Sequence, residues 1–281
     1  MSGETIFKEA ERKLNKWFFV DYSEAMELFE KAASRFKVEK NYSRAADAFM
    51  RAHQCALKSN DSYASSAALA NCVAMYKKFD MKKAETLLDM AVRAQIDNSK
   101  LREAAKLEKE FAESLYEDGR GMEAVEHFNK AKRYFSAEDM NSQAKNCDVA
   151  VAKIYGENDE FDKAISLYER LGRESVNGPL RHEAKEFYMR AMLCRLATIS
   201  NANCLEGSLE ASEALKTYMQ SDAQLSNTRE GEFLVLCSEA VESRDIDKFD
   251  VAVSLLQELR MLDDWKTHVL LVIKKNFESI L

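Results

Sequence analysis

Residues 41–60 read NYSRAADAFMRAHQCALKSN, and one pattern in this stretch returns along most of the chain. Phe49 and Ala52 follow Ala45 by four and seven places, which puts the three side chains on one face of a helix. A small residue lets a neighbouring helix approach, and the larger residue fills the groove beside it. The leading alanine recurs about every 20 residues, at Ala25, Ala45, Ala64, Ala84, Ala104, Ala124, Ala144, Ala164 and Ala184.

The interval predicts one helix of about 15 residues and a turn of about five. Two such units span about 40 residues, somewhat more than a tetratricopeptide repeat of about 34. The chain has 1 proline and 8 glycines in 281 residues, as long uninterrupted helices require. We therefore expect an all-α fold, a TPR-like solenoid of antiparallel helix pairs, with residues 1–200 forming the array and 201–281 a C-terminal helical cap.

Composition narrows the class of protein. No apolar run is long enough for a membrane span, the N-terminus lacks the features of a signal peptide, and Ser2 excludes N-myristoylation. A net charge of −7 argues against a general nucleic-acid binder. The 6 cysteines include no Cys-x-x-Cys pair and are expected to be buried free thiols in a reducing compartment. We expect a cytoplasmic protein.

A search for catalytic motifs returns none. There is no phosphate-binding loop, no nucleophile elbow and no zinc-protease motif, and the 4 histidines are far apart in sequence. Catalytic groups assemble in space, so Cys147 with a distant histidine stays open as an alternative. We expect no catalytic residue, no metal site, no cofactor and no small-molecule substrate.

Three segments depart from the repeat. The first is Trp17-Phe18-Phe19-Val20, four large apolar residues between two predicted helices. It is either a staple that covers the open end of the solenoid or an exposed apolar tip that enters a membrane interface, where Trp and Phe are favoured.

The second departure is a set of lysines and arginines spread over successive units between residues 77 and 195. Equivalent positions of alternate helices line one face of a solenoid, so these residues form either a basic stripe for an acidic partner or ordinary solvated charge.

The third is the segment 259–281, in which apolar residues share one helical face. This pattern indicates a terminal helix that docks on the array. The stripe consists of Leu262, Trp265, Val269, Ile273 and Phe277.

Four blocks together resemble the soluble NSF attachment proteins, and most closely their alpha type, including its yeast counterpart. They are AASRFK with NYSRAADAF in 32–49, FDKAISLYERLG in 161–172, AKEFYMRAMLC in 184–194, and LDDW ending in IKK in 262–275. The resemblance implies a right-handed superhelical array and an adaptor without catalytic activity. Such adaptors coat the four-helix SNARE complex, recruit the hexameric ATPase NSF and couple its work to SNARE disassembly.

The resemblance also assigns roles to residues. The SNARE-facing positions would be Lys77, Lys78, Lys100, Lys106, Lys145 and Lys185. Lys145 stands beside Asn146, which replaces an expected lysine, and Ala150 replaces another.

Both ends of the adaptor differ from the family pattern. Trp17, Phe18 and Phe19 occupy the place of the apolar membrane-attachment loop, which is shorter here and lacks its glycines. Glu239 and Glu242 match two acidic positions that face NSF, whereas Ser243 and Ile199 stand where two others are expected. The acidic tail is missing, and Leu281 is the candidate for the leucine that stimulates the ATPase.

Two alternatives remain open. A gamma-type attachment protein would share the fold, although blocks 184–194 and LDDW favour the alpha type. A generic TPR-like adaptor that clamps peptide C-termini would need a compact basic clamp on its first helices, whereas the basic residues here run along many units.

Overall fold

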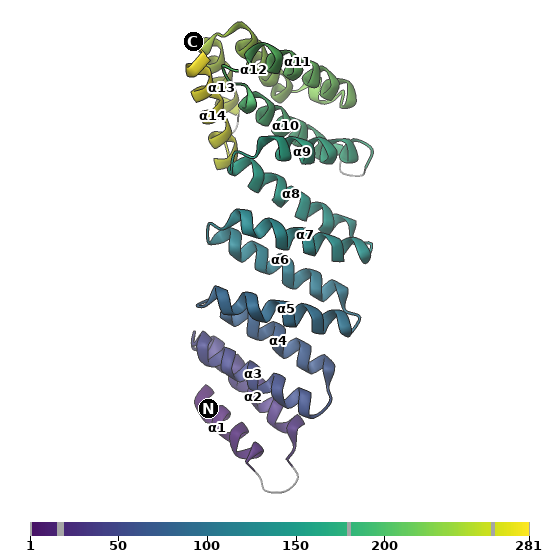
Figure 1. Cartoon of the computed structure of the whole chain (residues 1–281), viewed down its shortest axis with the longest axis vertical. Coiled ribbons are helices and arrows are strands. Elements are labelled where there is room, and N and C mark those ends of the chain that lie inside the picture. Colours follow the sequence, from purple (N-terminus) through teal and green to yellow (C-terminus); the bar gives the residue numbers. More distant parts are fainter. Residues whose placement is uncertain (1, 16–19, 179–180, 260–261, 281) are drawn as a thin grey trace. The chain divides into compact units, whose positions relative to one another are not determined.

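The computed structural model describes residues 2–15, 20–178, 181–259 and 262–280, and within these ranges the chain is helical and contains no strand. This confirms the predicted all-α fold (Figure 1). The α-helices are α1 (Gly3–Leu14), α2 (Tyr22–Val38), α3 (Tyr42–Lys58), α4 (Ser62–Tyr76), α5 (Met81–Asp97), α6 (Leu101–Glu117), α7 (Gly121–Ala137), α8 (Asn141–Glu157), α9 (Phe161–Val176), α10 (Ala184–Thr198), α11 (Cys204–Ser221), α12 (Arg229–Ser243), α13 (Ile246–Leu259) and α14 (Asp264–Ile280). Two short 3₁₀ helices, η1 (Arg181–Glu183) and η2 (Leu225–Asn227), precede α10 and α12.

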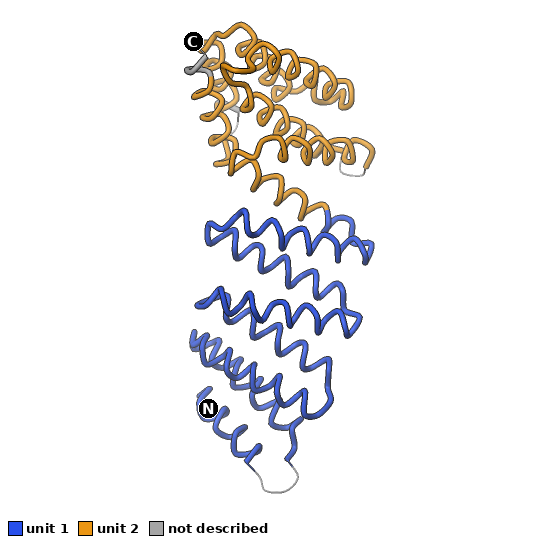
Figure 2. The backbone as a smooth tube through the Cα atoms, in the orientation of Figure 1, with its two compact units in different colours: residues 1–144 blue, residues 145–281 orange. Residues whose placement is uncertain are grey.

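The chain divides into two compact units, residues 1–144 and residues 145–281 (Figure 2). The boundary falls near the start of α8. In the first unit, α1 to α7 each pack against their neighbours in sequence. In the second, α10 packs against α9, α11, α12 and α14. The predicted division into residues 1–200 and 201–281 stays a prediction.

A recurrent turn produces the 20-residue period. The residue after the helical C-cap adopts a positive φ at Lys40, Asn60, Ser99, Gly119, Asp139 and Asp159. At the first of these turns, the backbone N–H of Asn41 donates to the carbonyl of Phe36 at 2.8 Å. This closure satisfies the last carbonyls of the helix. Residues 39–41 alone therefore connect α2 to α3, and each of these helices reaches 17 residues, longer than the interval predicted.

Side-chain caps start helices α3, α4 and α5. Asn41, Asp61 and Asp80 each accept a hydrogen bond from the backbone N–H three places on, at 2.9–3.2 Å. Such side-chain caps satisfy otherwise unpaired amide groups of the first turn. At the α2–α3 and α3–α4 junctions, the left-handed residue and the cap together fix where one helix ends and the next begins. Helices α6, α7 and α9 start without a side-chain cap bond.

The recurring alanines are buried, except that in α4 the buried position falls one residue later. Of the marked alanines, those at 25, 45, 84, 104, 124, 164 and 184 have no exposed surface, and Ala144 is also buried. Ala64 is half-buried, because α4 starts at the Asp61 cap and places Ser65 at the position that Ala45 holds in α3. Ser65 Oγ lies 3.0 Å from His53 Nδ1, so a polar contact replaces the apolar one there.

The C-terminal helix docks within the second unit, as its apolar stripe predicted. Trp265 of α14 is 2% exposed and stacks edge-on against Tyr168 of α9, with ring centroids 5.7 Å apart. A Cβ on Gly156 of α8 would lie 2.5 Å from the indole nitrogen, so glycine is what makes room for the ring. Val269 and Ile273 continue the buried face.

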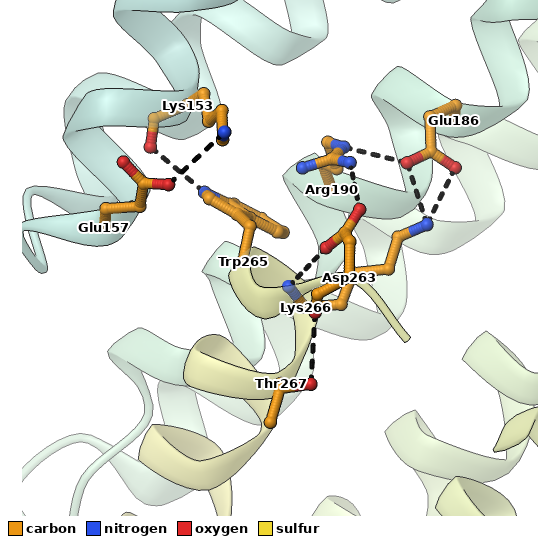
Figure 3. Close-up of polar contacts among 8 residues, drawn as sticks. All are labelled: Lys153, Glu157, Glu186, Arg190, Asp263, Trp265, Lys266 and Thr267. Carbon is orange, nitrogen blue, oxygen red and sulfur yellow. Dashed lines mark hydrogen bonds and ion pairs between the residues drawn. The ribbon is translucent and has the colours of Figure 1, made fainter. Parts of the chain in front are cut away.

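Charged groups surround the indole (Figure 3). The guanidinium of Arg190 lies 4.6 Å from the Trp265 ring centroid and pairs with Glu186 at 2.8 Å and Asp263 at 2.7 Å. Lys266 reaches Glu186 at 2.9 Å. Burial opposes charging of Arg190, but the nearby Tyr168, Glu186 and Asp263 outweigh it and raise its pKa. The network thus joins the first turn of α14 to α10.

Candidate protein-binding surfaces

Lys77 and Lys78 lie at the C-terminal end of α4. The Lys77 ammonium donates to the backbone carbonyl of Glu110 on α6 at 3.0 Å. Burial lowers the pKa of Lys77, although the neighbouring Glu110 partly opposes this. Lys78 is exposed. The first lysine therefore braces two helices, and the second projects into solvent.

Lys100 and Lys106 lie at the start of α6. The Lys100 ammonium sits 4.5 Å from the ring centroid of Tyr63, at the opposite end of α4 from Lys77. Lys106 is half exposed and pairs with Glu103 at 2.9 Å. Since Lys77 touches α6 at Glu110, these lysines are distributed along about 15 Å of α6. They form an open row and not a compact pocket.

Lys145 and Lys185, in the second unit, are both held in ion pairs. Lys145 is 19% exposed, and its ammonium contacts Glu183 at 2.6 Å and Ser175 Oγ at 3.0 Å. It also lies 5.1 Å from the Phe187 ring centroid. The Lys145 side chain therefore ties α8 to the segment before α10. Lys185 pairs with Glu230 of α12 at 3.3 Å.

Trp17, Phe18, Phe19 and Leu281 lie outside the described residues. The helices on either side of the apolar segment are joined near its ends, because Lys13 of α1 contacts Glu24 of α2 at 2.5 Å. The bond to Glu24 raises the pKa of Lys13.

Glu239 and Glu242 are exposed on α12, in the second unit. Within the described part of the chain neither carboxylate takes part in an ion pair. Glu239 also lines a groove beside η2, together with Glu232. Glu232 was not identified as a candidate site residue from the sequence. It lies seven residues, or two helical turns, before Glu239, and this spacing places both carboxylates on one face of α12 near Val235 and Leu236.

The cysteines and histidines have structural surroundings. All six cysteines are buried and outside disulfides, as expected, and burial raises the pKa of Cys72 to about 12. His127 Nδ1 lies 2.6 Å from Glu108 Oε2 in a buried pair that links α7 to α6. Across the described ranges no cluster of three or more metal-ligating side chains forms, and no helix is long and apolar enough to cross a bilayer.

Comparisons with known proteins assign the family. The profile described as soluble NSF attachment protein, SNAP, matches residues 1–278. The alpha-soluble NSF attachment protein of Vitis vinifera is 32% identical over 281 residues, covering 99% of this chain and 94% of the relative. The alpha-soluble NSF attachment protein of Mus musculus is 29% identical and covers 98% and 94%. The vesicular-fusion protein SEC17 of Coprinopsis cinerea is 30% identical and covers 99% and 96%.

A solved structure agrees on the fold. A signal transduction ATPase with a tetratricopeptide repeat sensor, from Pyrococcus horikoshii, superposes with a TM-score of 0.53 at 15% identity. The match covers 92% of this chain and 40% of that one, and it supports a TPR-like helical repeat. The resemblance to the alpha type is confirmed by the named relatives, which are attachment proteins and not enzymes. The chain belongs to the soluble NSF attachment protein family.

Proposed function

We propose that this protein is an adaptor that binds SNARE complexes and recruits the hexameric ATPase NSF, stimulating SNARE disassembly during vesicle-mediated transport. The observation that carries the proposal is the match to the attachment-protein family over residues 1–278. A helical repeat suits this task, because the surfaces of such repeats commonly hold other proteins. The protein would work in the cytoplasm and at the surface of membranes, without cofactor, nucleic acid or small-molecule substrate.

The SNARE-facing surface would use charge. Lys78, Lys100 and Lys106 reach the surface of the first unit without burying their ammonium groups in ion pairs with other helices. An open row of this kind offers complementary potential to an acidic helical bundle without demanding one sequence, which suits an adaptor that serves several complexes. Lys77, Lys145 and Lys185 would contribute less, since the ammonium group of each is already held in a hydrogen bond or ion pair with another element.

The ATPase-facing surface would use Glu239 and Glu242 on α12, together with Leu281. Both carboxylates are exposed and available to a basic partner. Trp17, Phe18 and Phe19 would add a weak membrane contact, which raises the local concentration of the adaptor near SNAREs anchored in the same bilayer.

The test is disassembly of a purified SNARE complex by NSF and ATP from the source organism, with and without this protein. We expect disassembly to depend on it. Binding to the SNARE complex without disassembly would contradict the ATPase coupling and favour a generic repeat adaptor. Absence of binding to the SNARE complex would contradict the proposal as a whole.

A further inference from the structure

A groove lies in the second unit where α11 ends and the chain passes through η2 into α12. Its volume is about 550 Å³. The floor is apolar and consists of the half-buried side chains of Met219, Val235 and Leu236. Ser226 also lines the groove and is exposed, as are Glu232 and Glu239, whose carboxylates we call the rim. The groove therefore offers an apolar surface between charged edges.

The wall of the groove is held in a fixed position. Thr228 caps α12, with its hydroxyl oxygen accepting from the backbone N–H of Gly231 at 3.1 Å. A Cβ at position 231 would collide with the carbonyl oxygen of Leu225, so only glycine allows α12 to start this close to η2. Leu225 of η2 is fully buried and packs in the core of the second unit. A groove built this way exists before a partner arrives, which reduces the cost of binding.

The two rim carboxylates have no partner within the described ranges. Glu232 and Glu239 are exposed and lie seven residues apart on α12, about 10 Å along the helix. The adjacent Glu230, by contrast, is held by Lys185 at 3.3 Å. Arg229 supplies a single cation at the start of the helix. The rim is therefore net acidic, which suits a basic protein segment and disfavours an anionic lipid surface.

We propose that this groove docks a segment of the ATPase that carries an apolar side chain between two basic ones. The inference rests on the proposed function, in which Glu239 faces that ATPase, and it adds the apolar floor and Glu232 to the contact. The apolar side chain packs on Met219, Val235 and Leu236 and supplies most of the affinity. The basic side chains reach Glu232 and Glu239, which fix the register and speed association.

Surface plasmon resonance on the immobilised full-length protein, with the source organism's intact ATPase as the probe, tests the groove. Val235→Ser removes part of the floor, and Ser226→Trp fills the groove from an exposed position. Leu209→Ser is the matched control, because Leu209 is an exposed apolar residue of α11 that does not line the groove. We expect each groove variant to bind about tenfold more weakly and the control to bind normally. SNARE binding should stay unchanged in all three. The melting temperature should fall modestly in Val235→Ser, because Val235 also packs against the core, and should stay unchanged in Ser226→Trp and in the control.

Three other outcomes are informative. If Glu239→Gln weakens ATPase binding while both groove variants bind normally, the groove inference is wrong and the proposed function survives. If the unmodified protein does not bind the ATPase, the proposed function fails and the inference fails with it. If the protein self-associates and Ser226→Trp abolishes this, the groove holds a second copy of the chain, and the inference is overturned.

Discussion

The indole N–H of Trp265 on α14 donates to the backbone carbonyl oxygen of Lys153 on α8 at 3.1 Å, across 112 residues of sequence (Figure 3). That carbonyl lies in the last turn and a half of α8, close to Gly156. The bond satisfies the one polar atom of a side chain that is otherwise packed as a core residue. Trp265 is therefore an aromatic anchor of the C-terminal helix, beside the buried Val269 and Ile273.

Replacing Trp265 tests this anchor. Trp265→Ala should lower the free energy of unfolding of the second unit by about 3–5 kcal/mol, because a fully buried aromatic ring leaves a large cavity. Trp265→Phe should cost less, since it keeps most of the packing and loses the hydrogen bond. Denaturant unfolding measures both, and Leu271→Ala, at a side chain 61% exposed on the same helix, is the control. Unchanged stability of Trp265→Ala would disprove the anchor.

The open row of lysines predicts salt-sensitive binding. The double variant Lys78→Glu, Lys106→Glu should bind a SNARE complex about tenfold more weakly at low salt, because two favourable charges become repulsive. The difference should narrow as added salt screens the charges. Binding titrations over a range of salt concentrations measure this. Lys163→Glu, at an exposed lysine outside the row, is the control. Equal loss in the control would indicate a general charge effect.

Lys145 should behave differently. Lys145→Gln leaves Glu183 without its cation and should lower the free energy of unfolding by about 1–2 kcal/mol. It should change SNARE affinity and its salt dependence little, because the ammonium is already paired inside the unit. Chemical denaturation alongside the same binding titration separates the two effects. A large loss of affinity with unchanged stability would show that Lys145 contacts the partner directly.

Burial of the thiols predicts a loss of stability at high pH. The pKa of Cys72 is raised to about 12 in the folded state, above its ordinary value of 9.0. Between these two pH values the unfolded chain loses this proton and the folded chain keeps it, so the thiol's contribution to stability is present below pH 9 and lost as pH rises toward 12. Comparing unfolding of Cys72→Ala with the parent between pH 8 and pH 11 isolates this contribution. A parallel decline in both proteins would contradict it.

The left-handed turn residues predict a pair of opposite effects. Lys40→Gly should stabilise the protein by about 0.5–1 kcal/mol, because φ is +56° there and the lysine side chain is strained in that conformation. Gly119→Ala should destabilise it by a similar amount, since φ is +77°. No atom lies within 4 Å of a Cβ built there, so crowding plays no part. Thermal unfolding of the two variants measures both effects. Melting temperatures that shift in the same direction would contradict the prediction.

Periodic features were readable from sequence, and pairwise features were not. The alanine spacing predicted the repeating helix-plus-turn unit and the buried face of each helix, because burial repeats with the helical period. The left-handed positions escaped notice because Lys40, Asn60, Ser99, Asp139 and Asp159 are not glycine. The register shift at Ala64 follows from the Asp61 cap, a single local bond.

At the candidate surfaces, too, the sequence indicated positions but not the contacts between side chains. Family resemblance located the lysines, but it did not reveal that Lys145 is paired with Glu183, 38 residues away, while Lys78 is exposed. The groove floor combines Met219 with Val235 and Leu236, which come from different helices joined by η2. Contacts of this kind depend on tertiary packing, which a single sequence does not display.

The repeated turn makes the array modular. Ser59 and Asn98 each cap the C-terminus of a helix, and a left-handed residue follows each of them. Excising residues 60–98 would join Ser59 to Ser99 and recreate the same turn, with a helix of the same length on either side. An ancestral duplication or loss of a helix pair would therefore require no new turn chemistry. The number of helix pairs in such an adaptor can change one pair at a time, while the backbone conformation of each turn stays the same.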